Sequence, residues 1–286
     1  MLIGAMEAGG TKFVCAVGDE NGNILQKTSF PTVSPEDTLA SAKQFFSSFK
    51  MEALGVGTFG PVDLNKNSKT YGSILNTPKT KWRYYPLLEK LQSEYNIPVY
   101  LDTDVNTACL GEYYYGAGKH AESCLYMTVG TGIGAGFVGE GKVFQGKNHP
   151  EMGHMLLKQH LNDTFVGSCP SHRSCFEGLA SGTAIEKRYG RKANLLTHLD
   201  EVWEIEAYYL AQGLMNIYVI LSPEKMVIGG GVMKQERLYA MVREQFMKLL
   251  NDYLEVNDVD ELIVPPKLDD EQAVKGAIAL AVKNKR

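Results

Sequence analysis

Two cysteines and a histidine are spaced three residues apart in the segment CPSHRSC. Cys169, His172 and Cys175 offer two sulfur ligands and one nitrogen ligand, and His149 or His154 of the earlier segment HPEMGH would complete a set of four. Four nitrogen and sulfur ligands with no open position are typical of structural Zn²⁺. The segment HPEMGH is not the zincin motif, because its histidines are five residues apart and its proline and glycine disfavour a helix. We therefore predict a structural zinc site, with unliganded buried cysteines as the alternative.

Three clusters of glycine each follow a predicted strand: Gly9-Gly10, Gly130–Gly136 and Gly229–Gly231. Glycine lets the backbone approach a ligand closely, and successive N–H groups can then point at an anion. One such cluster could be only a tight turn, whereas three at strand ends favour a cradle for a polyphosphate. The P-loop pattern GxxxxGK[ST] is absent from the sequence.

The second glycine cluster also matches the pattern GxGxxA of dinucleotide-binding proteins, at residues 130–135. That pattern must open a helix, because the pyrophosphate binds at a helix N-terminus. The residues that follow carry further glycines, each costing about 1 kcal/mol in a helix, and they are typical of a strand. A nicotinamide-dependent oxidoreductase is therefore disfavoured, and NAD binding without ATP binding would revive it.

An acidic residue lies at a predicted junction between a strand and a helix, in the segment LDTDVN. Asp104 is a candidate N-cap, which by itself would contribute about 1 kcal/mol to stability. It is also expected at the carboxyl edge of a sheet, where α/β proteins bind ligands. A carboxylate there could accept the proton of a hydroxyl that attacks a phosphoryl group. We favour this catalytic role for Asp104.

Strands and helices that alternate along the chain are expected to position these residues. The predicted strands are Leu2–Ala8, Lys12–Val17, Ile24–Ser29, Leu54–Phe59, Val99–Thr103, Cys124–Val129, a strand ending at Val138, Lys142–Gln145 and Lys225–Ile228. Helices are predicted after Ser34 to about Ser48, and at Val105–Tyr115, Ala207–Leu221, Leu238–Leu249 and about Glu271–Lys283.

The arrangement of strand, glycine turn, strand, turn and strand occurs twice, about 120 residues apart. We therefore predict a duplicated α/β architecture with a βββαβα core in each half. Its layout resembles the two-domain actin-like, hexokinase-like (ribonuclease H-like) ATPase fold. The predicted domains are residues 1–117, with residues 270–286 as a possible completing helix, and residues 118–269, which include the zinc-containing loops.

The composition excludes several classes of protein. The chain has 286 residues and a net charge of −4, with no block of basic residues, so a dedicated nucleic-acid-binding protein is disfavoured. Its apolar stretches are far shorter than the ~18 residues that span a membrane. No targeting signal is evident, and the cysteine count of 5 is odd, so a reduced, cytoplasmic protein is expected.

Seven segments, in this order, resemble those of a fructokinase of the ROK family (repressors, open reading frames, sugar kinases). They are EAGGTK, FGPVDL, DTDVN, TVGTGIGAG, HPEMGH, CPSHRSCFEGLASGTAI and GGGVM, and the match extends from about residue 1 to the end. The resemblance implies ATP-dependent phosphorylation of fructose at its 6-hydroxyl, with Mg²⁺ as cofactor. It also implies a homodimer.

The resemblance implies a role for individual residues, with Asp104 as the general base. The phosphates of ATP would be bound by Gly9, Gly10, Thr11, Lys12, Thr131 and Gly132, and its adenosine by Gly229, Gly230 and Gly231. The sugar would be bound by Gly60, Thr103, Asn106, Glu151, His154 and Glu177. The zinc ligands would be His154, Cys169, His172 and Cys175, so that zinc braces the loop that holds the sugar.

Two departures from the family pattern affect these expectations. Glu7 stands where many relatives carry aspartate, and Thr103 cannot offer the amide of the usual asparagine. The main alternative is a glucose, mannose or N-acetylmannosamine kinase of the same family. A repressor of the family would need a DNA-binding segment ahead of the strand expected from Leu2. A non-catalytic zinc-binding module would bind zinc without transferring phosphate.

Overall fold

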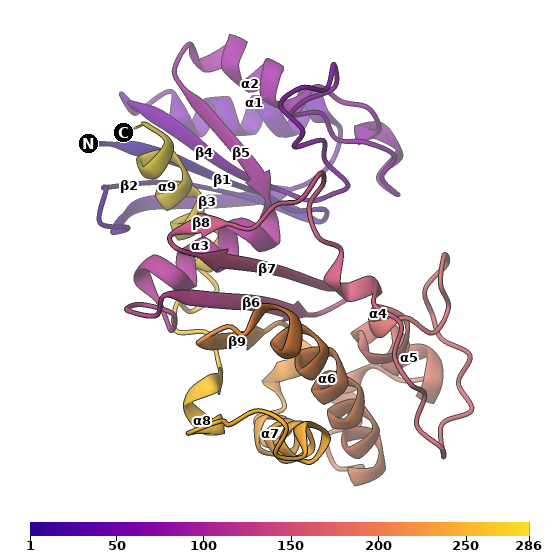
Figure 1. Cartoon of the computed structure of the whole chain (residues 1–286). Coiled ribbons are helices and arrows are strands. Elements are labelled where there is room, and N and C mark those ends of the chain that lie inside the picture. The colour runs from indigo at the N-terminus through magenta and orange to yellow at the C-terminus, as the bar shows by residue number, and fades with distance from the viewer. Residues whose placement is uncertain (286) are drawn as a thin grey trace. The chain divides into compact units, whose positions relative to one another are not determined.

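The computed structural model describes residues 1–285, which pack as two compact units (Figure 1). Unit 1 comprises Met1–His120, Gly136–Pro150 and the described residues from Lys267 onward. Unit 2 comprises Ala121–Ala135 and Glu151–Pro266. Residues 136–150, and the boundary residues 118–120 and 267–269, were placed in the second predicted domain but pack with unit 1. Each unit is described separately below.

Unit 1 is built on a five-stranded sheet with the order β3-β2-β1-β4-β5. β1 is antiparallel to β2 and parallel to β4, and β4 is parallel to β5. The strands are β1 (Ile3–Ala8), β2 (Lys12–Gly18), β3 (Ile24–Pro31), β4 (Ala53–Thr58) and β5 (Val99–Thr103). The helices are α1 (Pro35–Phe46), α2 (Leu87–Tyr95), α3 (Asp104–Tyr115) and α9 (Gln272–Lys285), with a short 3-10 turn η1 (Thr80–Trp82).

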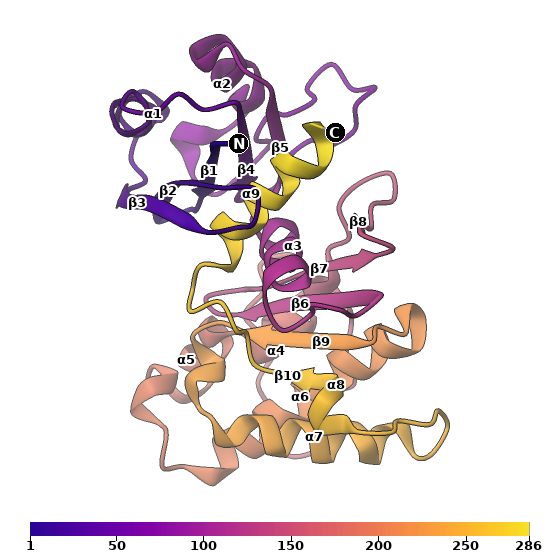
Figure 2. The same cartoon turned by 90° about the vertical axis from the view of Figure 1, so that its left-hand side faces the viewer.

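Both faces of the unit 1 sheet are buried. Alternate residues of a strand point to opposite faces, so each strand contributes side chains to both sides. Met6 and Ala8 of β1 pack on one side with residues of α1 and α2. Ile3 and Ala5 pack on the other side with the apolar face of α9. The last helix of the chain thus completes the core of the unit that contains the N-terminal strands (Figure 2).

Helix α9 also packs closely on α3, and two glycines allow this approach. A Cβ atom on Gly276 would collide with the carbonyl group of Thr107, and one on Gly111 would collide with the backbone of Gln272. Any larger residue at either position would push the two helices apart. Helix α3, which begins with Asp104, is therefore held in place by its close packing against α9.

The second sheet has the order β10-β9-β6-β7-β8, and the chain passes from unit 2 to unit 1 within β7. β9 is parallel to both β6 and β10, while β8 is antiparallel to β7. The strands are β6 (Ser123–Val129), β7 (Ile133–Gly139), β8 (Lys142–Val143), β9 (Lys225–Gly229) and β10 (Ile263–Val264). The helices of unit 2 are α4 (Phe176–Ala180), α5 (Gly182–Tyr189), α6 (Asp200–Leu221), α7 (Arg237–Leu250) and α8 (Val259–Leu262), with 3-10 turns η2 (Met152–His154), η3 (Ala193–Leu195) and η4 (Val232–Lys234).

The predicted α/β class is confirmed, and apart from α6 the predicted strands and helices lie within a few residues of those observed. Helix α6 begins at Asp200, about two turns before the predicted start at Ala207, because its first turns bury Val202 and Trp203. Helices α2, α4, α5 and α8 and strand β10 were not predicted. In α2 only three of the nine residues are buried. Within residues 1–285, no helix is both long and apolar enough to cross a membrane.

Candidate functional site

The ends of three neighbouring strands in unit 1 bring predicted site residues together. Ala8 of β1 is in register with Thr58 of β4, and Thr58 is in register with Thr103 of β5. The strands are parallel, so the segments that follow them leave from the same edge of the sheet. These segments begin with Gly9, with Phe59-Gly60 and with Asp104. One sheet edge therefore carries the first glycine turn, Gly60 and the predicted base.

Helix α3 begins at Asp104, but its N-cap is Thr103. The Thr103 hydroxyl accepts a hydrogen bond from the N–H of Asn106 at 3.1 Å, as an N-cap side chain does. Asp104 was a candidate for the N-cap, but the cap is Thr103, which has the extended backbone that the cap requires. Asp104 is instead the first helical residue, and its carboxylate accepts the N–H of Val105 at 2.8 Å. Its position at the positive end of the helix dipole still favours the ionised form.

A buried hydrogen-bonded chain supports this first turn from within unit 1. Asp102 accepts hydrogen bonds from the side-chain amide of Asn106 at 2.6 Å and from the N–H of Thr103 at 2.7 Å. The same amide lies 3.2 Å from Nδ1 of His149. Burial raises the pKa of Asp102 to about 6 and lowers that of His149 to about 4. His149 is therefore neutral near pH 7, and its Nδ1 can accept from Asn106.

Glu7 lies near the end of β1, and several charges of unit 1 act on it. Burial raises the pKa of Glu7 to about 7, and the negative charge of Asp104 acts in the same direction. Lys12 opposes the rise, while Asp270 adds to it. This sheet edge consequently holds two close carboxyl groups, one of which is part-protonated near neutral pH.

The first glycine turn, between β1 and β2, has one face open for a ligand. The N–H of Gly9 donates to the carbonyl of Lys12 at 3.1 Å, and the hydroxyl of Thr32 donates to the carbonyl of Gly9 at 2.6 Å. A Cβ atom on Gly10 would meet only the end of the Lys79 side chain, at 3.4 Å. Thr11 and Lys12 are exposed. The turn is thus fixed on one side and accessible at Gly10.

In unit 2, two helices hold the second glycine turn, between β6 and β7. The N–H of Gly182, at the start of α5, donates to the carbonyl of Gly130 at 2.7 Å. The hydroxyl of Thr183 donates to the carbonyl of Thr131, also at 2.7 Å. A side chain at Gly132 would collide with the carboxylate of Glu177, which belongs to α4. The turn is therefore built around a close contact with the helix that follows the cysteine segment.

Glu177 has a second contact with this turn. Its carboxylate accepts a hydrogen bond from the N–H of Ile133 at 3.0 Å. Glu151 and His154 lie close enough to act on each other electrostatically. Desolvation raises the pKa of Glu151, with His154 opposing the rise and Glu177 adding to it. The structure thus groups the three residues that we expect to bind sugar hydroxyls.

The glycines of the third cluster, after β9, differ in what surrounds them. Gly230 has a φ of +97°, and a Cβ atom on it would collide with the backbone of Val129. Gly229 is close to Pro266, whereas a Cβ atom on Gly231 would meet nothing within 4 Å. Glycine is therefore required at position 230 by the conformation of the backbone, whereas Gly231 leaves open space beside the turn.

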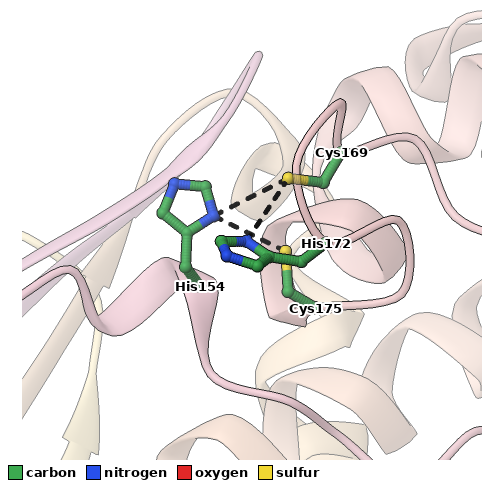
Figure 3. Close-up of side chains that lie close together, drawn as sticks. All are labelled: His154, Cys169, His172 and Cys175. Carbon is green, nitrogen blue, oxygen red and sulfur yellow. Dashed lines mark hydrogen bonds between the residues drawn. The ribbon is translucent and has the colours of Figure 1, made fainter.

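The four predicted zinc ligands form a compact cluster in unit 2 (Figure 3). Their ligand atoms all lie within 4.8 Å of one another. Nδ1 of His154 is 3.5 Å from the sulfur of Cys175 and 3.8 Å from that of Cys169, and Nδ1 of His172 is 3.8 Å from the sulfur of Cys169. Figure 3 shows all four side chains pointing toward a common centre.

This cluster fits a closed tetrahedral zinc site, since it offers two sulfur and two nitrogen ligands. Of the two histidines that the sequence left open, His154 is the one in the cluster. The backbone supports this placement, because Cys169 pairs with Arg173 and Leu156 pairs with Cys175 through isolated bridges.

Sequence reasoning missed several residues that hold the site. Asp102 and His149 bond Asn106, and Thr183 holds the second glycine turn. The available signals in the sequence were an acidic residue two positions before Asp104 and a glycine-threonine pair at the start of a helix. Neither pattern is specific enough to be recognised without the fold.

Comparison with known proteins identifies the family. The family model described as "ROK family" matches residues 3–284. The chain belongs to the ROK family. Its relatives include a fructokinase of Streptococcus mutans, 45% identical over 288 residues that cover 99% of this chain and 98% of the relative. A fructokinase of Pediococcus pentosaceus is 43% identical over 281 residues, covering 98% of each chain.

The solved structures include a ROK hexokinase from Thermus thermophilus, which is 28% identical to this ROK-family chain. The two structures share a TM-score of 0.83, with coverage of 100% of this chain and 99% of the other. The predicted hexokinase-like architecture of this ROK protein is thereby confirmed.

Proposed function

We propose that this ROK-family chain is a fructokinase that transfers the terminal phosphoryl group of ATP to the 6-hydroxyl of fructose. The substrate follows from the fructokinases that are 43% and 45% identical over nearly the whole chain. One structural observation carries the chemistry. A single edge of the unit 1 sheet presents Asp104, Gly60 and the open glycine turn at Gly10.

Asp104 is the proposed general base. As the first residue of a twelve-residue helix, it lies where the helix dipole stabilises its negative charge. The carboxylate would accept the proton of the sugar hydroxyl as that oxygen attacks the phosphorus atom. Thr103, Asn106 and Asp102 hold the first turn of the helix and so fix the direction of this carboxylate.

The residues implied by the family resemblance would bind the sugar and ATP. Glu151, His154 and Glu177 would accept or donate hydrogen bonds to sugar hydroxyls, together with Asn106 and Gly60. The backbone N–H groups of the turns at Gly9–Lys12 and Thr131-Gly132 would bind phosphates, and Gly229–Gly231 would adjoin the adenosine. Mg²⁺ bound to ATP would supply positive charge that neutralises the phosphate oxygens.

Zinc is proposed as a structural ion. The ligands His154, Cys169, His172 and Cys175 would join the loop that contains Glu151 to the segment that leads into α4. Glu177 of α4 bonds the second glycine turn, so the ion would brace sugar-binding and phosphate-binding residues at the same time.

A panel of hexoses tests the substrate. The purified chain is assayed with ATP and Mg²⁺ against fructose, glucose, mannose and N-acetylmannosamine, and kcat/KM is measured for each. We expect fructose to have the highest value. A higher value for another hexose would replace fructose as the substrate, and the absence of transfer to any of them would overturn the kinase assignment. Light scattering tests the expected homodimer, and fractionation of cells tests the expected cytoplasmic location.

A further inference from the structure

Unit 1 contains a cavity of about 610 Å³ that is separate from the residues assigned above to catalysis and to ATP binding. Its volume lies within the range of pockets that hold small molecules in proteins. The cavity lies against β5, the edge strand of the sheet, and its other walls come from α3, the end of α9 and the β7–β8 turn. Figure 2 labels these elements.

The walls of the cavity are tied together by hydrogen bonds. The hydroxyl of Tyr114, on α3, donates to the carbonyl of Gly141 in the β7–β8 turn at 2.9 Å. The side-chain amide of Gln145 donates to the carbonyl of Leu64 at 3.4 Å. Both bonds join segments that are far apart in the sequence, so the cavity is formed before any ligand binds.

Three lysines line this cavity: Lys66, Lys142 and Lys283. Within residues 1–285, none of these three ammonium groups lies in an ion pair with a carboxylate. Lys283 lies over the ring of Tyr114, at 4.4 Å from its centroid. The cavity lining also includes the exposed carboxylate of Glu140, which the three lysines outnumber. Three cations that come from three different segments favour an anionic group, such as a phosphate.

The remaining lining groups suit a sugar. Tyr71, Tyr100 and Tyr114 offer aromatic rings, against which the C–H faces of a sugar ring can pack. Asp102 contributes a carboxylate that is about nine-tenths buried and can accept hydrogen bonds from hydroxyl groups. The lysines and the buried carboxylate lie on different segments. A ligand with a phosphate at one end and hydroxyls at the other therefore fits them better than a simple anion.

We propose that this cavity, which we call the β5 cavity, is a second binding site, that it takes a phosphorylated sugar, and that its occupant acts on the first turn of α3. The connection is Asp102, whose carboxylate bonds both the N–H of Thr103 and the amide of Asn106. Thr103 caps the helix that begins with Asp104. A ligand that bonds Asp102 therefore changes the support of the proposed base, and the two sites are coupled.

Direct binding tests the site. Fructose 6-phosphate is titrated calorimetrically into the full chain in the presence of saturating fructose and a non-hydrolysable ATP analogue, which keep the product from binding at the proposed active site. We expect one molecule to bind per chain. The triple variant Lys66→Gln, Lys142→Gln, Lys283→Gln should weaken this binding at least tenfold. The control triple variant Lys50→Gln, Lys90→Gln, Lys119→Gln makes the same change of charge at exposed lysines outside the cavity, and it should bind as the wild type does.

Each alternative outcome overturns part of the proposal. Equal weakening of binding in both triple variants would show that only the net charge of the protein matters. If inorganic phosphate bound as tightly as fructose 6-phosphate, the cavity would recognise phosphate and not a sugar. Hydrogen exchange locates the ligand. Slowing is expected in the segments that line the cavity, residues 64–71, 99–102, 140–145 and 280–284, and in the first turn of α3, and slowing only in other segments would place the ligand elsewhere.

Kinetics tests the coupling. Without phosphorylated sugar, the Lys66, Lys142, Lys283 variant should have the kcat and fructose KM of the wild type within about twofold. Added fructose 6-phosphate should change kcat at saturating fructose in the wild type but not in this variant. The same response in both proteins would show that the cavity does not act on the base. The binding experiment does not depend on which sugar the enzyme phosphorylates, so failure of the fructokinase proposal and failure of this one are distinguishable.

Discussion

The carboxyl groups of Glu7 and Asp104 repel each other at the edge of the unit 1 sheet, where β1 ends and α3 begins. Burial, and in second place this repulsion, raises the pKa of Glu7 from 4.5 to about 7. The folded chain therefore binds a proton at Glu7 more tightly than the unfolded chain does. Below about pH 4.5 both states hold this proton, and above about pH 7 both have lost it.

The first prediction concerns the effect of this proton on stability. As pH rises from about 4.5 to about 7, the wild type should lose unfolding free energy relative to Glu7→Gln, because only the wild type must ionise a buried carboxyl group. The loss should be at most about 3.5 kcal/mol, at about 1.4 kcal/mol for each pKa unit. Urea denaturation at pH 4.5, 6 and 8 measures it. A constant difference between the two proteins across this range would contradict the raised pKa.

The second prediction concerns the base. Asp104→Asn should lower kcat for fructose by about 10²–10⁴, because the amide cannot accept the hydroxyl proton. The melting temperature should change little, since asparagine can still accept the N–H bond of Val105. Asp252→Asn, an equal change at an exposed carboxylate, is the control and should retain activity. Near-normal turnover by Asp104→Asn would end its assignment as the base.

The third prediction concerns the metal. Elemental analysis should find about one zinc per chain in the wild type and little in Cys169→Ser. Loss of the ion should lower the melting temperature by about 5–10 °C, because metal binding stabilises only the folded chain. Cys124→Ser changes a buried cysteine outside the cluster and should retain the zinc. Cobalt substitution adds a spectroscopic check, and equal zinc content in the two variants would exclude Cys169 as a ligand.

The fourth prediction separates ATP binding from sugar binding. Gly10→Val should raise the KM for ATP at least tenfold, because its side chain would occupy the open face of the first glycine turn. The KM for fructose should stay within about twofold. The fold should tolerate the change, since the added Cβ atom meets only the flexible end of Lys79. An equal rise in both KM values would count against a phosphate role for this turn.

The fifth prediction distinguishes two adjacent glycines. Gly230→Ala should destabilise the protein by about 1–3 kcal/mol, because alanine is strained at a φ of +97° and its Cβ atom would meet the backbone of Val129. Gly231→Ala should leave stability unchanged, since nothing lies within 4 Å of its Cβ position. Thermal melts of the two variants give the comparison, and equal destabilisation would show that the turn does not have this conformation.

The sequence by itself determined the features that depend on residues close together in the chain. The spacing of Cys169, His172 and Cys175 specified three candidate metal ligands, and the glycine clusters at Gly9 and Gly130 specified turns after strands. The change from a strand to a helix at Asp104 was equally local. Backbone hydrogen bonding and side-chain reach over a few residues decide such features, so a single sequence carries them.

Only the tertiary structure decided the features that depend on distant segments meeting. It placed His154, which the family resemblance implied and the spacing left open, in the Cys/His cluster, and it bonded His149 of the same short segment to Asn106. It gave the N-cap to Thr103, because the backbone conformation at the end of β5 is fixed by pairing in the sheet. Contacts between segments arise from packing of the whole core, which spacing along the chain does not specify.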